Sequence, residues 1–255
     1  MARPKGPSIE LLYRDAALVG VNKPSGTVVH RGWAKDEVVV MTVTRDLIGQ
    51  WVYPLHRLDR GTSGVVLFGL SSAIAARANR CFETGQVRKR YLALVRGITP
   101  AAGTIDHPVP NKAKGPRVAA VTHYRRLDTF ERFSLVEALP ETGRLHQIRR
   151  HLKHISHPLV GDVNYGKGEI NRMFRSRFGL HRLALHAVSI ALPHPETDNL
   201  VTIVAPLTDD FAGPLAQMGL LPAAQAAVAA PVSAAEPGPK KTTSRPPGSG
   251  PGQAS

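Results

Sequence analysis

The sequence contains a single cysteine, Cys81, among its 255 residues. One thiol can form neither an intramolecular disulfide nor the cysteine ligand set of a zinc site, so both are excluded. No window approaches the roughly 18 consecutive apolar residues of a membrane-spanning helix, and the N-terminus, MARPKGPSIELLYRD, has no apolar stretch of signal-peptide length. These absences predict a cytoplasmic protein that does not bind membranes.

Aromatic and acidic residues are also scarce. Aromatic side chains make up 5% of the chain, which argues against an extended platform for stacking single-stranded bases. The 33 lysines and arginines face 19 acidic residues, and the formal net charge is +14. Such an excess favours a polyanionic partner, because each phosphate neutralised by Lys or Arg releases condensed counterions. Nucleic acid is therefore the expected partner.

The composition changes near Pro222. From there to Ser255 the chain consists mainly of Ala, Pro, Gly and Ser and has no aromatic residue. A segment of this kind buries too little surface to offset the entropy lost on ordering, which predicts disorder. We therefore expect a flexible N-terminus over residues 1–8, one folded domain over 9–221 and a disordered tail over 222–255.

Within the folded domain, strand-like segments alternate irregularly with helix-like ones. Short apolar or alternating runs predict strands within 9–15, 17–30, 65–70, 88–97, 133–140 and 184–195. Residues 71–85 predict a helix capped by Ser71 or Ser72, and residues 145–155 predict a second. Many strands with few helices and no regular alternation are typical of an α+β fold, with a mixed or antiparallel sheet and flanking helices.

The helix predicted over 145–155 has one clear apolar face. Its four apolar side chains fall within an arc of roughly 80° at about 100° per residue: Leu145, Ile148, Leu152 and Ile155. Arg149 falls about 40° beyond Leu145, at the edge of this arc. Its side chain is therefore expected to point inward, although a snorkelling surface arginine would fit the same position.

One short segment carries a carboxylate between two cations. In HRLDRGTSG (56–64), Asp59 stands between Arg57 and Arg60 and is followed by small turn-forming residues. Opposite charges favour the ionised form of a carboxylate, and an ionised, positioned carboxylate can act as a nucleophile or general base. An ion-paired surface loop would have the same composition.

Three further segments occur in a fixed order with this one. They are VNKPSG (21–26), KRYLALVRG (89–97) and ETGRLHQIRRHL with HPLVGDVNYG (141–152, 157–166). Together with HRLDRGTSG, they resemble the ordered motifs of the RluA family of RNA pseudouridine synthases. The resemblance spans residues 9 to about 210, implies the catalytic fold of that family and assigns catalysis to the folded domain.

The resemblance implies a role for each of four residues. Asp59 matches the aspartate that attacks the target nucleotide, and Arg57 matches the arginine that enters the RNA helix as the base leaves. Tyr91 matches the tyrosine that packs on the flipped base and can help remove its C5 proton; a buried core tyrosine is the alternative. Arg149 matches the basic residue that pairs with the aspartate. Isomerising uridine adds and removes no atoms, so neither a cofactor nor a metal is expected.

The expected substrate is an RNA, and the stretch 21–50 with HRLDR most resembles family members that modify uridine 65 in the T stem of transfer RNA. Two alternatives remain open: a ribosomal RNA pseudouridine synthase of the same family, and a non-catalytic RNA-binding protein. No obligate protein partner is evident, which favours a monomer.

A metal-dependent phosphodiesterase is the third alternative, because four histidines fall close together: His146, His151, His154 and His157. On a helix, however, His146 and His151 lie about 140° apart and cannot share a coordination sphere. Only His151 and His154 are neighbours, and two ligands without a nearby carboxylate form a weak site. The spacing therefore does not favour a metal.

Overall fold

The computed structural model describes residues 8–31, 38–112 and 115–231. The strands are β1 Glu10–Arg14, β2 Leu18–Lys23, β3 Tyr53–Pro54, β4 Ser63–Gly69, β5 Arg88–Arg96, β6 Ala102–Asp106, β7 Val109–Pro110, β8 Arg117–Val118, β9 Val121–Phe130, β10 Phe133–Pro140, β11 Leu185–Pro193 and β12 Leu200–Val204. The helices are α1 Val40–Ile48, α2 Ser72–Glu83, α3 Gln147–His154, α4 Gly168–Phe178, α5 Asp209–Gln217 and α6 Leu221–Ala229.

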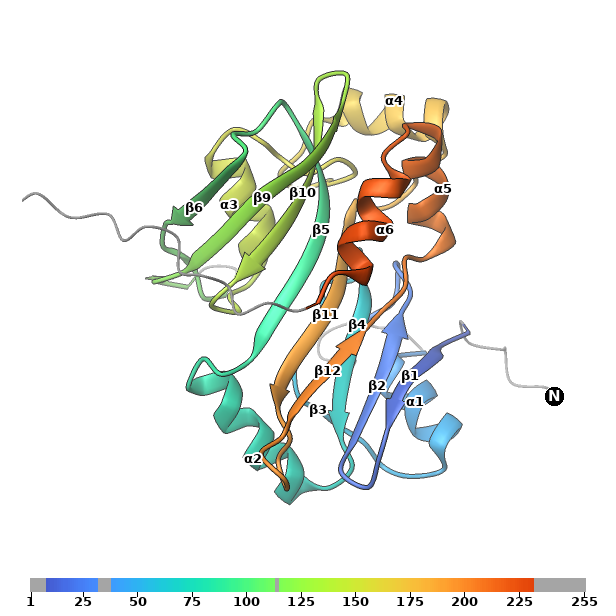
Figure 1. Ribbon diagram of the computed structural model, residues 1–255, viewed down its shortest axis with the longest axis vertical. Coiled ribbons are helices and arrows are strands. Elements are labelled where there is room, and N and C mark those ends of the chain that lie inside the picture. Colours follow the sequence, from blue (N-terminus) through green and yellow to red (C-terminus); the bar gives the residue numbers. More distant parts are fainter. Residues whose placement is uncertain (1–7, 32–37, 113–114, 232–255) are drawn as a thin grey trace, which may run out of the picture.

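Ten of these strands form one twisted sheet in the order β1-β2-β4-β11-β5-β10-β9-β6, with β12 on β11 and β3 on β4 (Figure 1). Within the described ranges, β4 and β11 form the only parallel pair, and the other pairs are antiparallel. The predicted α+β fold with a mixed sheet is confirmed. Each of the six predicted strands is present.

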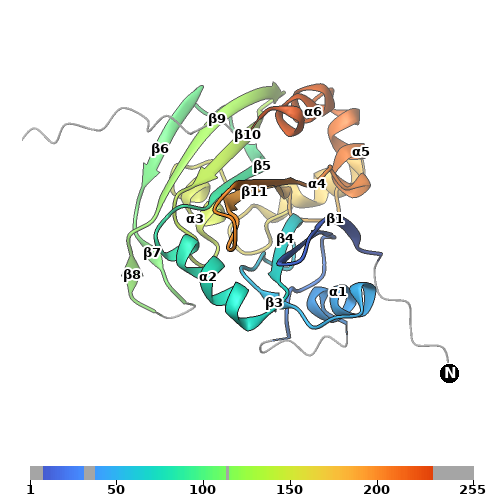
Figure 2. The ribbon, with the colours of Figure 1, turned by 60° about the horizontal axis from the view of Figure 1, so that its bottom comes forward.

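The central strands bury both faces, because side chains alternate along a strand. Leu92 and Leu94 of β5 face the core formed with α4, α5 and α6, whereas Ala93 and Val95 face the core that includes α3. Figure 2 shows α5 and α6 on one side of β5 and β10 and α3 on the other. The centre of the sheet is therefore covered on both faces.

Of the two helices predicted from spacing, one begins where the sequence predicts and the other begins later. Ser71 caps α2, and its side chain accepts a hydrogen bond from the amide of Ile74 at 3.2 Å. The second helix begins at Gln147 instead of 145, because His146 adopts a left-handed φ of 54° that cannot continue the helix backward. Arg149 is 7% exposed, which confirms that it points inward.

The prediction of disorder from residue 222 onward was wrong for the start of the tail. Residues Leu221–Ala229 form α6, and Ala224 and Ala227 are buried against the core beneath α4 and α5. Alanine has the highest helix propensity, and its small side chain lets the helix backbone approach the core. The rest of the predicted tail, from residue 232, and residues 1–7 lie outside the described residues.

Candidate active site

Asp59 lies in the loop between β3 and β4. The neighbouring Leu58 is buried in the core, and the turn is closed by the amide of Thr62, which donates to the carbonyl of Asp59 at 3.0 Å. His56 accepts a hydrogen bond from the amide of Leu67 on β4 at 3.1 Å, which holds the start of the loop on the sheet. The Asp59 side chain is left 21% exposed at the wall of a pocket.

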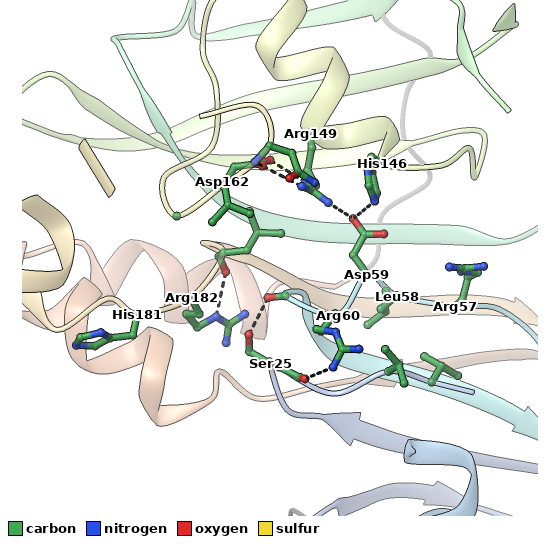
Figure 3. A pocket seen from close by; sticks show the side chains of 18 of the residues that line it. Ser25, Arg57, Leu58, Asp59, Arg60, His146, Arg149, Asp162, His181 and Arg182 are labelled. Atoms are coloured by element: carbon green, nitrogen blue, oxygen red, sulfur yellow. Dashed lines mark hydrogen bonds and ion pairs between the residues drawn. The ribbon is translucent and has the colours of Figure 1, made fainter. Parts of the chain in front are cut away.

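Arg149 joins Asp59 to a second carboxylate (Figure 3). Its Nη1 donates to Asp59 Oδ2 at 2.9 Å, while Nε and Nη2 donate to the two oxygens of Asp162 at 2.7 and 2.9 Å. Asp162 has a fully buried side chain. Burial opposes its ionisation, but hydrogen bonds from Arg149 and from the amides of Tyr165 and Asn164 outweigh burial and lower the pKa of Asp162. Both carboxylates therefore depend on one guanidinium.

The two oxygens of Asp59 differ in their surroundings. Oδ2 accepts the bond from Arg149 and lies 3.8 Å from Nε2 of His146. Oδ1 has no hydrogen-bond partner within the part of the chain that the structure describes. A pocket-lining carboxylate that is anchored through one oxygen, with the other oxygen not hydrogen-bonded, has the geometry of a nucleophile held ready for attack.

The pairing of Arg149 with Asp59 that the resemblance implied is present in the structure, whereas the expectation that the adjacent Arg57 also holds this carboxylate is wrong. Arg57 is exposed, and among the described residues no ion pair joins it to Asp59. Arg60 donates from Nη1 to the carbonyl of Gly26 at 3.3 Å. Residues next to one another in an extended segment project their side chains in different directions, so sequence neighbours need not meet in space.

Tyr91 lies on β5, paired with Ala138 on one side and Ala187 on the other. Its side chain is partly buried against two of the core clusters and does not line the pocket that Asp59, Arg57 and Arg149 share. Burial, followed by the negative charge of Asp59, raises the pKa of Tyr91 well above its usual value. The phenol is therefore protonated at neutral pH and lies within electrostatic reach of Asp59.

His146 was considered from the sequence only as a possible metal ligand, and its position beside Asp59 was not predicted. The residue precedes α3 with its left-handed φ of 54°, and its Nδ1 lies 3.1 Å from the hydroxyl of Tyr165. Burial lowers the pKa of His146, although the charge of Asp59 opposes this effect. An unusual backbone angle at a non-glycine residue is a feature that concentrates at functional sites.

The remaining histidines of the cluster have separate partners. His151 lies 2.8 Å from the hydroxyl of Thr122, His157 lies 2.9 Å from the carbonyl of Arg96, and His154 stacks on His107. Across the described ranges, no three His, Cys, Asp or Glu side chains are grouped so that they could hold a metal ion.

Lys23, which was not predicted to have a role, fixes the loop from behind. Its side chain is completely buried, and Nζ donates to the carbonyls of Pro24, Arg60 and Thr62 at 2.9, 3.2 and 2.6 Å. Burial, together with the nearby charge of Arg182, lowers the pKa of Lys23 to about 7. The VNKPSG segment therefore supports the HRLDRGTSG loop through one amine.

We predict that Lys23 makes the stability of this protein depend on pH above 7. Between a folded pKa of about 7 and an unfolded pKa of about 10.4, the unfolded chain binds a proton that the folded chain does not. Stability contributed by this group therefore rises with pH, by up to about 1.4 kcal/mol per pH unit. Urea unfolding at pH 7, 8 and 9 should show this slope for wild type relative to Lys23→Met. If the free energy of unfolding changes with pH equally in wild type and Lys23→Met, the prediction is contradicted.

The pocket beside Asp59 has a cavity volume of about 620 Å³ and a basic wall. Six arginines line it: Arg31, Arg57, Arg60, Arg149, Arg175 and Arg182. The acidic lining residues are Asp59 and Asp162, and both are engaged by Arg149. The cavity falls in the size range of ligand sites, about 300–1,000 Å³, and its charge suits an anion.

The chain is similar in sequence to known proteins over most of its length. A family model described as RNA pseudouridylate synthase matches residues 17–154. The tRNA pseudouridine synthase C of Vibrio cholerae is 43% identical over 234 residues, which cover 83% of this chain and 96% of that protein. The protein of the same name from Pectobacterium carotovorum is 43% identical over 237 residues, but these cover 62% of its own length.

Solved structures are similar over most of the chain. The human RNA pseudouridylate synthase domain containing 1 matches with a TM-score of 0.68 at 26% identity, covering 83% of this chain and 89% of that one. The human RNA pseudouridylate synthase domain containing 4 matches with a TM-score of 0.68 at 27% identity, and the match covers 82% of this chain and 93% of that one. The chain belongs to the RNA pseudouridylate synthase family. It is an isomerase that forms pseudouridine in RNA.

Proposed function

We propose that this protein converts uridine 65 in the T stem of transfer RNA to pseudouridine, with Asp59 as the nucleophile. The observation that carries the proposal is the arrangement of Asp59, which lines the pocket and is fixed through Oδ2 by Arg149, while Oδ1 has no hydrogen-bond partner among the described residues. The transfer RNA substrate is supported by relatives named tRNA pseudouridine synthase C that are 43% and 44% identical.

The remaining roles follow from position and charge. Arg57 is exposed at the pocket wall and is assigned to the space that the flipped base leaves, where an inserted side chain offsets the few kcal/mol that unstacking costs. Arg149 orients Asp59 through the hydrogen bond and ion pair to Oδ2. Tyr91 does not line the described pocket but lies within electrostatic reach of Asp59, and we assign it to packing against the base once the base has flipped in; its raised pKa keeps it a neutral phenol.

The chemistry needs little beyond these groups. Asp59 forms a covalent bond to the nucleotide as the N-glycosidic bond breaks, and the base turns while it stays in the pocket. Carbon C5 then bonds to the ribose as the bond to Asp59 breaks, the proton leaves C5, and N1 takes up a proton from solvent. The basic wall binds RNA, and the same pocket retains the freed uracil. Since no atoms are exchanged with a second substrate, we propose that no cofactor is used. We further propose a catalytic domain from residue 9 to 229 that acts as a monomer in the cytoplasm.

Mapping the product tests the proposed substrate. After incubation of unmodified transfer RNA with the purified protein, we expect pseudouridine at position 65 and at no other uridine. A transcript carrying cytidine at position 65 is the matched control and should yield no pseudouridine. Product in ribosomal RNA fragments but not in transfer RNA would contradict the proposal and favour the ribosomal alternative.

A further inference from the structure

The pocket also contains basic side chains with no assigned role. Arg182 is one of them, but its guanidinium is fully used within the protein: it donates to the hydroxyl of Ser63 at 2.7 Å, to Asp210 at 2.9 Å and to backbone carbonyls. Arg175 and His181 also line the pocket. Both are exposed, and neither side chain has a hydrogen bond or ion pair within the described ranges.

Helix α4 holds Arg175 in a fixed position at this wall. The helix buries Phe174 and Phe178 in the core. Asn171 fixes its start to the loop of Asp162, because its side chain accepts from the amide of Gly161 at 2.9 Å and donates to the carbonyl of Asp162 at 3.0 Å. Arg175 therefore stands on a rigid element that is tied directly to the loop carrying a partner of Arg149.

A second arginine of α4, Arg177, has the ion pair and the ring contact that Arg175 lacks within the described part of the chain. Arg177 pairs with Glu131 at 2.8 Å and lies over the ring of Phe178 at 4.8 Å, and it does not line the pocket. No carboxylate of the described residues pairs with Arg175. Both lining carboxylates are taken by Arg149, so no carboxylate of the described residues balances the positive charge of Arg175.

We propose that Arg175 and His181 bind a backbone phosphate of the RNA adjacent to the target nucleotide. Figure 3 shows His181 and Arg57 on opposite sides of Asp59, so a strand that crosses the pocket can contact Arg57 on one side and this pair on the other. The guanidinium fork matches the oxygens of a phosphate, and phosphate contacts position an RNA without reading its sequence. This inference rests on the proposed function.

The test measures binding of unmodified transfer RNA over a range of salt concentrations, in proteins that also carry Asp59→Asn so that no turnover occurs. Arg175→Ala should weaken binding roughly tenfold, as expected for losing a charged hydrogen bond. It should also reduce the salt slope by about 0.7–0.9, the contribution of one phosphate. Arg175→Lys should preserve most of the slope. Arg177→Ala removes the same charge from the same helix and should change the affinity less than twofold.

Two results would overturn the phosphate site: equal effects of Arg175→Ala and Arg177→Ala, or weaker binding with an unchanged salt slope. If Arg175 and His181 share one phosphate, the double substitution should weaken binding by less than the product of the single effects. If the double substitution weakens binding by the full product of the two single effects, Arg175 and His181 do not share a phosphate. The proposed function is judged separately, by whether wild type forms pseudouridine at all, so either idea can fail alone.

Discussion

Replacing Asp59 with asparagine is expected to abolish pseudouridine formation while leaving RNA binding intact. Asparagine keeps the size of the side chain, and its oxygen can still accept the hydrogen bond that Arg149 donates at 2.9 Å. It cannot supply a carboxylate nucleophile. Loss of a nucleophile in other enzymes lowers turnover by about 10⁶-fold, so we expect a decrease of at least about 10⁴-fold. The measurement is release of tritium from uracil C5 of labelled transfer RNA, since this proton leaves when the base rejoins through carbon.

The control for this experiment is Asp128→Asn. Asp128 is exposed on β9 and does not line the pocket, so this variant makes the same chemical change elsewhere and should release tritium like wild type. RNA affinity should be equal or slightly higher in Asp59→Asn, because one negative charge is removed from a surface that binds phosphates. Residual activity within tenfold of wild type would show that Asp59 is not the nucleophile.

Local sequence patterns were sufficient to predict some of the strands and helices, but neither the remaining elements nor their arrangement. The apolar run of residues 65–70 and the serine before the helix at 72 are signals contained within a few residues, and both predict elements that the structure contains. The parallel pairing of β4 with β11 joins Ser63 to His186. That contact depends on packing across more than half the folded chain, and no local period encodes it.

The same distinction applies to the site. Asp59 and Arg149 could be predicted to lie together because the motifs resemble a family and the helical spacing turns Arg149 inward. Asp162 was quoted only within a motif, and nothing in its neighbourhood indicates that it binds the guanidinium from a buried position. Lys23 was missed for a related reason: an isolated lysine beside a turn looks like a surface residue until the distant carbonyls of Arg60 and Thr62 are placed around it.

The tail shows how composition can mislead. A segment rich in alanine and proline has too few large apolar side chains to fold alone. The core beneath α4 and α5 nevertheless offers an apolar surface on which Ala224 and Ala227 pack. Tertiary contacts therefore supply the stability that the segment's own sequence lacks.

Replacing Arg149 with methionine is expected to remove both activity and a large share of stability. The substitution leaves Asp162 buried without its cation, and breaking a buried ion pair in this way costs about 3–5 kcal/mol. The hydrogen bonds of Arg149 help to lower the pKa of Asp162, so stability from this pair is present above the unfolded pKa of about 3.9 and is lost as pH falls through the lower folded value. Urea unfolding should therefore show a smaller difference between wild type and Arg149→Met at pH 3 than at pH 7.

A double variant separates the two effects of Arg149. Adding Asp162→Asn to Arg149→Met removes the buried charge, and the free energy of unfolding should recover by about half or more of the loss, because a neutral amide is far less costly to bury than an unpaired carboxylate. Activity should not recover, because Asp59 still lacks the guanidinium that orients its Oδ2. Tritium release by the double variant at the wild-type rate would mean that Arg149 serves only to stabilise the fold. A stable but inactive double variant would place the guanidinium in the chemistry, as the partner that keeps the open oxygen of Asp59 directed at the base.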